Sequence, residues 1–93
     1  MENELICYQI EVKGKVQGVW FRDSTLKKAT ELGVKGFIKN QADGSVYIEA
    51  EGSKNALDKF IEWCQEGPPF AKVESVDVKD LELTYFEKFK IVW

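Results

Sequence analysis

The stretch LICYQIEVKGKVQGVWFRDSTLKKATELG, residues 5–33, changes its periodicity twice. In residues 5–12 the apolar positions Ile6, Tyr8, Ile10 and Val12 alternate with other residues, the pattern of a strand. Residues 13–20 contain two glycines and no helical period, and they are therefore expected to form a loop. From Phe21 the apolar spacing becomes helical and ends at Gly33, a residue type that often terminates helices. The predicted order is strand, loop and helix.

The rest of the chain continues this alternation. Residues 34–40 and 46–50 are predicted strands, and the turn residues 42–44 between them indicate a hairpin. Ser53 is a plausible helix cap, and a second helix is expected to run until Gly67. Three valines in residues 73–78 suggest a fourth strand. The alternation in residues 89–93 suggests a fifth, C-terminal strand against an edge of the sheet.

These elements predict an α+β fold of the ferredoxin-like βαββαβ type, with two helices on one face of an antiparallel sheet. The length of 93 residues favours one domain, residues 1–93. In this topology the first two strands run in the same direction with the third between them. The loop at 14–22 and Asn40 are therefore expected to be neighbours at one edge of the sheet.

Composition excludes several kinds of site. The sequence has no histidine, and its two cysteines are too few for an all-cysteine zinc or iron–sulfur site. Cys7 and Cys64 are expected to be free thiols. The net charge of −3 argues against binding to nucleic acid or to a membrane surface. Seven cations nevertheless fall between Lys13 and Lys39 against only two acidic residues, which favours a small anionic ligand.

The first twenty residues contain several charges and no apolar run longer than Leu5–Tyr8. Neither a signal peptide nor a membrane span is expected, so the predicted location is the cytoplasm. The sequence has no heptad repeat or long apolar stripe, which makes a monomer the default expectation.

The loop between the first strand and the first helix is the candidate anion site. Free backbone amides at a helix start attract negative charge, and Gly14 and Gly18 allow the chain to curve around a phosphate-sized group. Arg22 lies where the helix begins, and its guanidinium fork can hold two phosphate oxygens at once. The loop matches neither nucleotide-binding glycine motif, so nucleotide binding is not indicated.

Asn40 lies at the end of the second strand, where its side chain would serve either the turn or a bound water. A carboxamide cannot take a proton, so a catalytic Asn40 would orient a water molecule. The acidic residues Asp23, Asp43, Glu49 and Glu51 could instead be paired catalytic carboxylates. Glu49 and Glu51 are expected to be solvated on the strand face opposite the apolar one, which argues against that alternative.

Two motifs resemble the signatures of the acylphosphatase family. The segment Val12-x-Gly14-x-Val16-Gln17-Gly18-Val19-x-Phe21-Arg22 is similar to the first, and Gly36-Phe37-Ile38-Lys39-Asn40-x-x-x-Gly44-x-Val46 followed by Gly52 is similar to the second. The resemblance spans nearly the whole chain. Trp20 stands at a position that the first signature leaves free, where its indole would narrow the entrance or alter substrate preference.

The resemblance implies a hydrolase without metal or cofactor that converts acyl phosphates into carboxylate and inorganic phosphate. It assigns the substrate phosphate to the amides of Lys15, Val16, Gln17, Gly18, Val19 and Trp20 and to the Arg22 side chain, and the attacking water to Asn40. Inorganic phosphate or sulfate should occupy the same site. The alternative is a ferredoxin-like sensor domain that binds phosphate or acyl phosphate without hydrolysing it.

Overall fold

The computed structural model describes residues 4–93 and contains two helices and five strands. The elements are β1 (Leu5–Lys15), α1 (Phe21–Leu32), β2 (Lys35–Asn40), β3 (Val46–Ser53), α2 (Lys54–Glu66), β4 (Lys72–Leu81) and β5 (Phe89–Val92). The predicted order and the C-terminal strand are confirmed. Residues 1–3 of the predicted domain lie outside the described residues.

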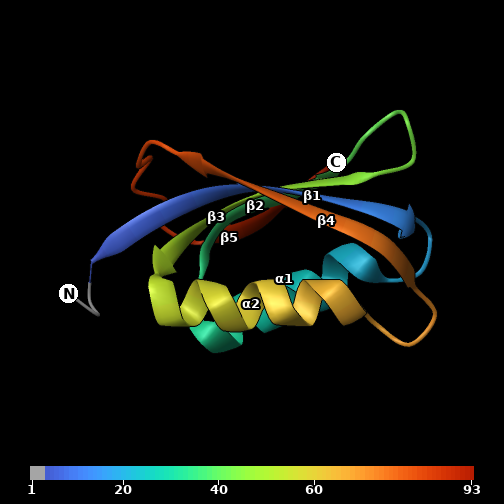
Figure 1. The fold of residues 1–93 in the computed structure, drawn as a ribbon, viewed down its shortest axis with the longest axis horizontal. Coiled ribbons are helices and arrows are strands. Elements are labelled where there is room, and N and C mark those ends of the chain that lie inside the picture. The colour runs from blue at the N-terminus through green and yellow to red at the C-terminus, as the bar shows by residue number, and fades with distance from the viewer. Residues whose placement is uncertain (1–3) are drawn as a thin grey trace.

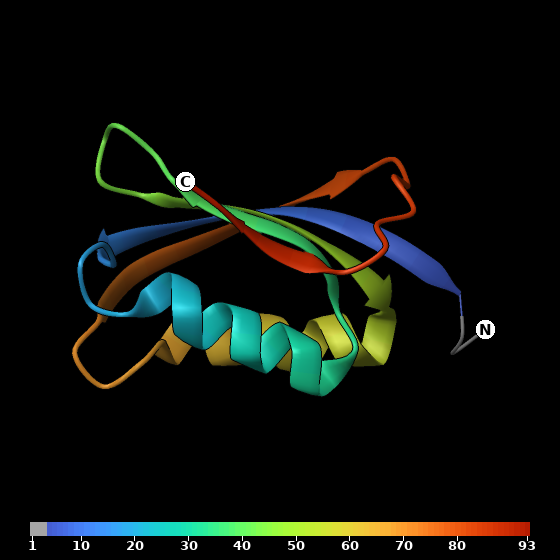
Figure 2. The same ribbon diagram turned by 180° about the vertical axis from the view of Figure 1, so that it is seen from behind.

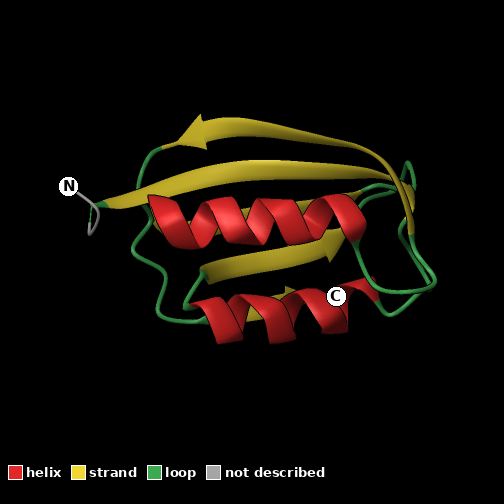
Figure 3. Cartoon of the chain, turned by 60° about the horizontal axis from the view of Figure 1, so that its bottom comes forward, coloured by secondary structure: helices red, strands yellow, loops and turns green. Residues whose placement is uncertain are grey.

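The five strands form one sheet in the order β4-β1-β3-β2-β5, and both helices cover the same face of it (Figures 1 and 2). The two helices lie side by side along the strands (Figure 3). The first four strands pair in the antiparallel sense, but β5 pairs with β2 in parallel. The sheet is therefore mixed rather than purely antiparallel, because the chain crosses from one edge of the sheet to the other after β4.

The strand register brings the two sequence motifs to one edge of the sheet. Val46 of β3 pairs with Val12 near the end of β1 and also with Asn40 at the end of β2. Two interstrand spacings separate Val12 from Asn40, a distance of about 10 Å. The expectation that the loop after β1 and the end of β2 are neighbours is thus confirmed.

The core lies between the sheet and the helices. Phe21, Thr25 and Ala29 form the buried face of α1, as its spacing predicted. Helix α2 begins after Ser53, whose side chain accepts a hydrogen bond from the Ala56 amide at 3.2 Å. Its buried residues Leu57, Phe60 and Cys64 pack against apolar residues of the central strands. This packing fixes the start of α1 at the same end of the molecule as Asn40.

The prediction that Glu51 is solvated is wrong. Glu51 is only 2% exposed, and its carboxylate accepts hydrogen bonds from the amides of Thr84, Tyr85 and Phe86 at 2.7, 3.1 and 2.8 Å. These amides belong to the segment between β4 and β5, which covers this face of the sheet. Cys7, the partner of Glu51 in the β1–β3 ladder, is also buried. Among the described residues, no helix has the length and apolarity needed to cross a bilayer.

Candidate active site

The loop that joins β1 to α1 has the backbone shape of an anion site. Gly18 and Trp20 both adopt left-handed conformations, with φ of 71° and 64°. Left-handed residues within a turn direct successive N–H groups toward a common centre, and such concavities bind anions. Within residues 4–93, no hydrogen bond of the structure uses an amide of residues 16–20 as its donor. These amides therefore remain available to a ligand.

The loop owes its course to a close contact between β1 and β4. Gly14 has φ of 129°, and any Cβ there would collide with the carbonyl oxygen of Lys72. The register of the two strands shifts at this point, between Lys13 and Gly14. Val16 and Val19 are then buried and anchor the loop in the core. Only a glycine at position 14 allows the chain to leave the sheet this way.

Arg22 lies in the first turn of α1, directly after this loop. Its guanidinium Cζ lies 4.2 Å from the centroid of the Trp93 ring, a cation–π contact. Both side chains line a surface hollow of about 310 Å³ together with Gly18, Trp20 and Asp23. The unpaired amides at the start of α1 add the positive end of the helix dipole to this charge.

Asn40 ends β2 on the face that the helices cover, since it lies two residues after the fully buried Ile38. Its Oδ1 is buried and has no hydrogen-bond partner within residues 4–93. A buried acceptor without a partner is costly, and native proteins leave one mainly where a ligand or water completes it. The second interpretation, that Asn40 bonds its own turn, therefore lacks support at this oxygen.

Gln17 connects the loop to the β2–β3 hairpin through its side chain. Its Nε2 donates hydrogen bonds to the carbonyl oxygens of Gln41 and Ser45, both at 2.8 Å. Gln41 in turn donates to Glu11 at 2.7 Å and to the Ser45 hydroxyl at 2.8 Å. The anion loop and the residue after Asn40 are thus held in one hydrogen-bonded unit.

The acidic residues do not form a paired catalytic site. Asp43 accepts hydrogen bonds from the amide and hydroxyl of Ser45, and these bonds lower the pKa of its carboxyl. Glu49 accepts a hydrogen bond from Tyr47, whereas Glu51 holds the segment before β5. Within residues 4–93, no group of three or more cysteine, aspartate or glutamate side chains is placed to hold a metal ion.

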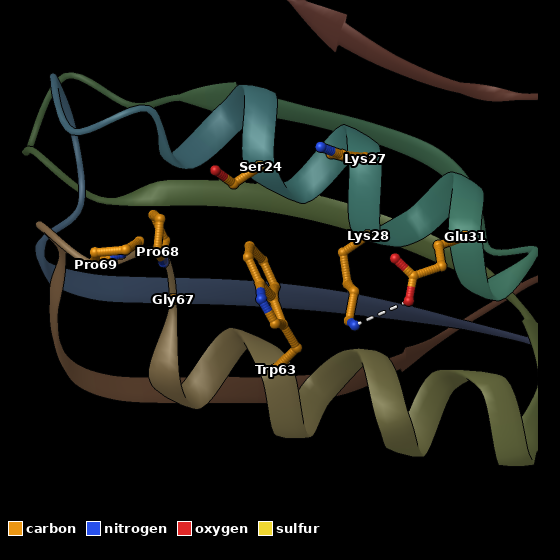
Figure 4. Close-up of a pocket in the computed structure, with 8 residues that line it drawn as sticks. All are labelled: Ser24, Lys27, Lys28, Glu31, Trp63, Gly67, Pro68 and Pro69. Carbon is orange, nitrogen blue, oxygen red and sulfur yellow. Dashed lines mark hydrogen bonds and ion pairs between the residues drawn. The ribbon is translucent and has the colours of Figure 1, made fainter.

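The basic residues of the 13–39 sector are distributed over several surfaces of the molecule. Lys27 and Lys28 line a separate hollow between α1 and the end of α2, shown in Figure 4. Lys28 pairs there with Glu31 at 3.2 Å, and Trp63 stands between the helices. Lys39 lies over the Tyr47 ring at 5.3 Å. Arg22 is the cation of this sector that lines the hollow beside the anion loop.

Two features of the site were missed from the sequence. The alternation in residues 89–93 indicated a strand but gave no reason to place Trp93 over Arg22. Gln17 was expected to contribute its amide, whereas its side chain braces the loop. A glutamine with two possible carbonyl partners leaves no periodic signal, so only the folded chain reveals such a role.

Comparison with known proteins agrees with both motifs. The acylphosphatase family model matches residues 8–91. The chain is 46% identical over 89 residues to an acylphosphatase of Archaeoglobus fulgidus. The aligned residues make up 96% of this chain and all of that protein. The acylphosphatase structure from Bacillus subtilis is 40% identical, with a TM-score of 0.92 over 95% of this chain and 99% of that one. The structure from Coxiella burnetii is 38% identical, with the same TM-score over 97% and 94% of the two chains. On this evidence the chain belongs to the acylphosphatase family.

Proposed function

We propose that this protein hydrolyses acyl phosphates to carboxylate and inorganic phosphate, using Arg22 and the amides of residues 15–20 to bind the phosphate and Asn40 to orient water. The observation that carries the proposal is the set of unbonded amides at residues 16–20, which ends at an arginine in the first turn of a helix. The alternative with catalytic carboxylates is less favoured, because Asp43, Glu49 and Glu51 are each engaged in hydrogen bonds with other protein groups.

Arg22 is suited to hold phosphate while it remains stacked on Trp93. The indole lies 4.2 Å from the guanidinium carbon, whereas hydrogen bonds to phosphate oxygens form through the N–H groups of the guanidinium. The ring restricts the position of the guanidinium without using its donors. Arginine also keeps its charge throughout the accessible pH range. The phosphate would therefore meet a positive group whose position is restricted before binding.

In this reaction the protein needs to contribute mainly the positioning of the reacting groups and the stabilisation of charge. In-line attack of water forms a P–O bond as the P–O bond to the acyl group breaks, and the carboxylate leaves with the electron pair. A carboxylate needs no proton from a general acid near neutral pH. Electrostatic stabilisation of the equatorial phosphoryl oxygens then accounts for catalysis, and each preorganised donor contributes about 10²- to 10³-fold in rate.

Asn40 supplies the acceptor for the attacking water. Its buried Oδ1 has no partner among residues 4–93, so it is free to accept a hydrogen bond from that water. The carboxamide cannot remove the proton, and we assign that proton to an oxygen of the substrate phosphate. Asn40 thus contributes by orientation, which is the effect expected from a fixed near-attack geometry.

The decisive experiment measures phosphate release from acetyl phosphate by the purified protein, with and without EDTA. The proposal expects hydrolysis above the spontaneous rate and no effect of the chelator. Carbamoyl phosphate is a further candidate of the same chemistry. Binding of inorganic phosphate with no hydrolysis would instead indicate a sensor domain. Activity that EDTA abolishes would contradict the metal-independent mechanism.

We further propose that residues 1–93 form a single domain that acts as a cytoplasmic monomer. The site described above uses residues of one chain, from Gly14 to Trp93, which supports function without a second subunit. Light scattering of the purified protein at micromolar concentration tests the monomer. A dimer at those concentrations would contradict it.

A further inference from the structure

Two exposed tryptophans line the same hollow as Arg22. Trp20 is 72% exposed and Trp93 is 84% exposed, although both have large apolar rings. Both line the hollow that contains the Arg22 side chain. Trp20 also holds a left-handed backbone conformation, which is unfavourable for a residue with a side chain. Two exposed indoles in one hollow beside the anion loop are typical of a functional surface.

The position of the hollow determines which part of a substrate would reach it. The phosphate would be held by the loop amides and the edge of Arg22, as proposed above. Trp20 and Trp93 line the hollow together with Arg22, so a group attached to a phosphate held by Arg22 would lie against the indoles. Its volume of about 310 Å³ exceeds the roughly 150 Å³ that an enclosed cavity needs to hold benzene.

The charge of the residues that line the hollow restricts which acyl groups could bind there. Asp23 is an exposed carboxylate among the lining residues. It would repel an acyl group that carries a second negative charge, because Arg22, the cation that lines the same hollow, is already engaged by the phosphate. Lys27, one helical turn after Asp23, lines the other hollow together with Lys28. Flat apolar rings pack well against indole faces, whereas a methyl group would cover little of them.

From this arrangement we propose that Trp20 and Trp93 form an acyl-group subsite that selects acyl phosphates with a flat, uncharged, apolar acyl group. The proposal rests on the proposed function for its substrate, but the subsite itself can be tested by binding alone. Stable phosphonates serve as probes because their C–P bond is not hydrolysed. Benzylphosphonate presents a ring to the subsite, methylphosphonate presents only a methyl group, and phosphonoacetate presents a carboxylate.

The experiment measures the affinity of the three probes by calorimetry and the hydrolysis of benzoyl phosphate and acetyl phosphate. We expect benzylphosphonate to bind about 10-fold more tightly than methylphosphonate, and phosphonoacetate to bind most weakly. Trp20→Ala should reduce the benzyl-to-methyl preference about 5-fold. Asp23→Asn should improve the affinity for phosphonoacetate. A circular dichroism melt confirms that each variant folds.

Tyr85→Ala is the matched control. Tyr85 is 70% exposed and also has a left-handed backbone, with φ of 63°, but it lies in the segment between β4 and β5 at the opposite end of the sheet. Its removal should leave the preference unchanged. Equal affinities for benzyl- and methylphosphonate in the wild-type protein would overturn the subsite, as would a preference that survives Trp20→Ala.

The two proposals fail in different ways. A benzyl preference that depends on Trp20, combined with no hydrolysis of either acyl phosphate, would overturn the proposed reaction and still support the subsite. Hydrolysis of both acyl phosphates with equal kcat/KM, combined with equal phosphonate affinities, would overturn the subsite and leave the proposed reaction intact. Each outcome therefore decides at least one of the two.

Discussion

Gln17 and Gln41 connect the two halves of the candidate site, because the Nε2 of Gln17 donates a 2.8 Å hydrogen bond to the Gln41 carbonyl oxygen. Gln17 belongs to the anion loop, and Gln41 directly follows Asn40. A second bond from the same nitrogen reaches Ser45. The distance between the bound phosphate and the attacking water would thus be set by a side chain that touches neither.

Gln17→Ala tests this connection. We expect stability to fall by about 1–2 kcal/mol, because two hydrogen bonds are lost, and kcat/KM for acetyl phosphate to fall by up to about 100-fold, because the loop is free to shift. Urea unfolding and steady-state kinetics measure the two effects. Gln9→Ala is the control, since Gln9 also makes a side-chain bond, to Tyr47, away from the loop. If both variants kept full activity, Gln17 would be a purely structural residue.

Arg22→Lys tests whether phosphate binding requires the planar guanidinium group of arginine. Lysine keeps the charge but presents a single point donor and a weaker stack on Trp93. We expect kcat/KM for acetyl phosphate to fall about 10²- to 10³-fold without loss of folding. The reciprocal change Lys27→Arg, on an exposed position of the same helix, should leave activity as it is. Near-normal hydrolysis by Arg22→Lys would remove Arg22 from the mechanism.

Asn40→Ala separates water positioning from phosphate binding. The side chain ends in a buried Oδ1 that no group of residues 4–93 contacts by a hydrogen bond, so its removal should leave the phosphate cradle in place. We expect kcat to fall about 100-fold, while the affinity for inorganic phosphate stays near the wild-type value. Asn55→Ala, an exposed position of α2, controls for the substitution. Lost phosphate affinity with retained turnover at saturation would reverse the assignment.

The sequence predicted those parts of the site that depend on periodicity. Alternation placed β1, a short apolar run placed β2, and helical spacing placed the start of α1; topology then brought the loop and Asn40 to one edge. These features are local, or follow from connecting local elements. The parallel pairing of β5 was not predicted, because four residues of strand pattern do not reveal which edge they join or in which direction.

The features that were missed depend on contacts between distant parts of the chain. Glu51 lies in an alternating strand and looked solvent-facing, but residues 84–86, more than thirty positions later, cover it and donate three amides. Trp93 meets Arg22 across more than seventy positions. Neither contact affects the local pattern on which sequence prediction depends, and both concern polar or exposed residues that hydrophobic periodicity ignores.

The two cysteines predict a loss of stability at alkaline pH. Burial raises the pKa of the Cys64 thiol to about 12, and burial together with Glu51 and Glu49 raises the pKa of Cys7 to about 11. Both thiols have their ordinary pKa near 9 in the unfolded chain. As pH rises above that value, the unfolded state loses protons that the folded state keeps, so stability falls until the folded pKa is reached.

Urea unfolding at pH 8 and pH 10 measures this effect. We expect about 1 kcal/mol less stability per thiol at pH 10. Cys64→Ala should lose stability at both pH values because it leaves a cavity, but its decrease between pH 8 and pH 10 should be about half that of the wild type. An identical decrease in wild type and variant would show that Cys64 ionises as readily in the folded state as in the unfolded one.

Glu51→Gln tests the segment that covers the outer face of the sheet. The Glu51 carboxylate accepts three amide hydrogen bonds, whereas a glutamine amide would turn its own N–H groups toward those donors. We expect a stability loss of about 2–3 kcal/mol, because hydrogen bonds to a buried charged group are among the strongest. Glu49→Gln, on the same face of β3, loses one bond from Tyr47 and should cost less stability.

The covering segment between β4 and β5 lies at the end of the sheet away from Arg22. Both variants should therefore hydrolyse acetyl phosphate at the wild-type rate below their unfolding temperature. A large fall in kcat for Glu51→Gln with unchanged stability would instead link this carboxylate to the reaction.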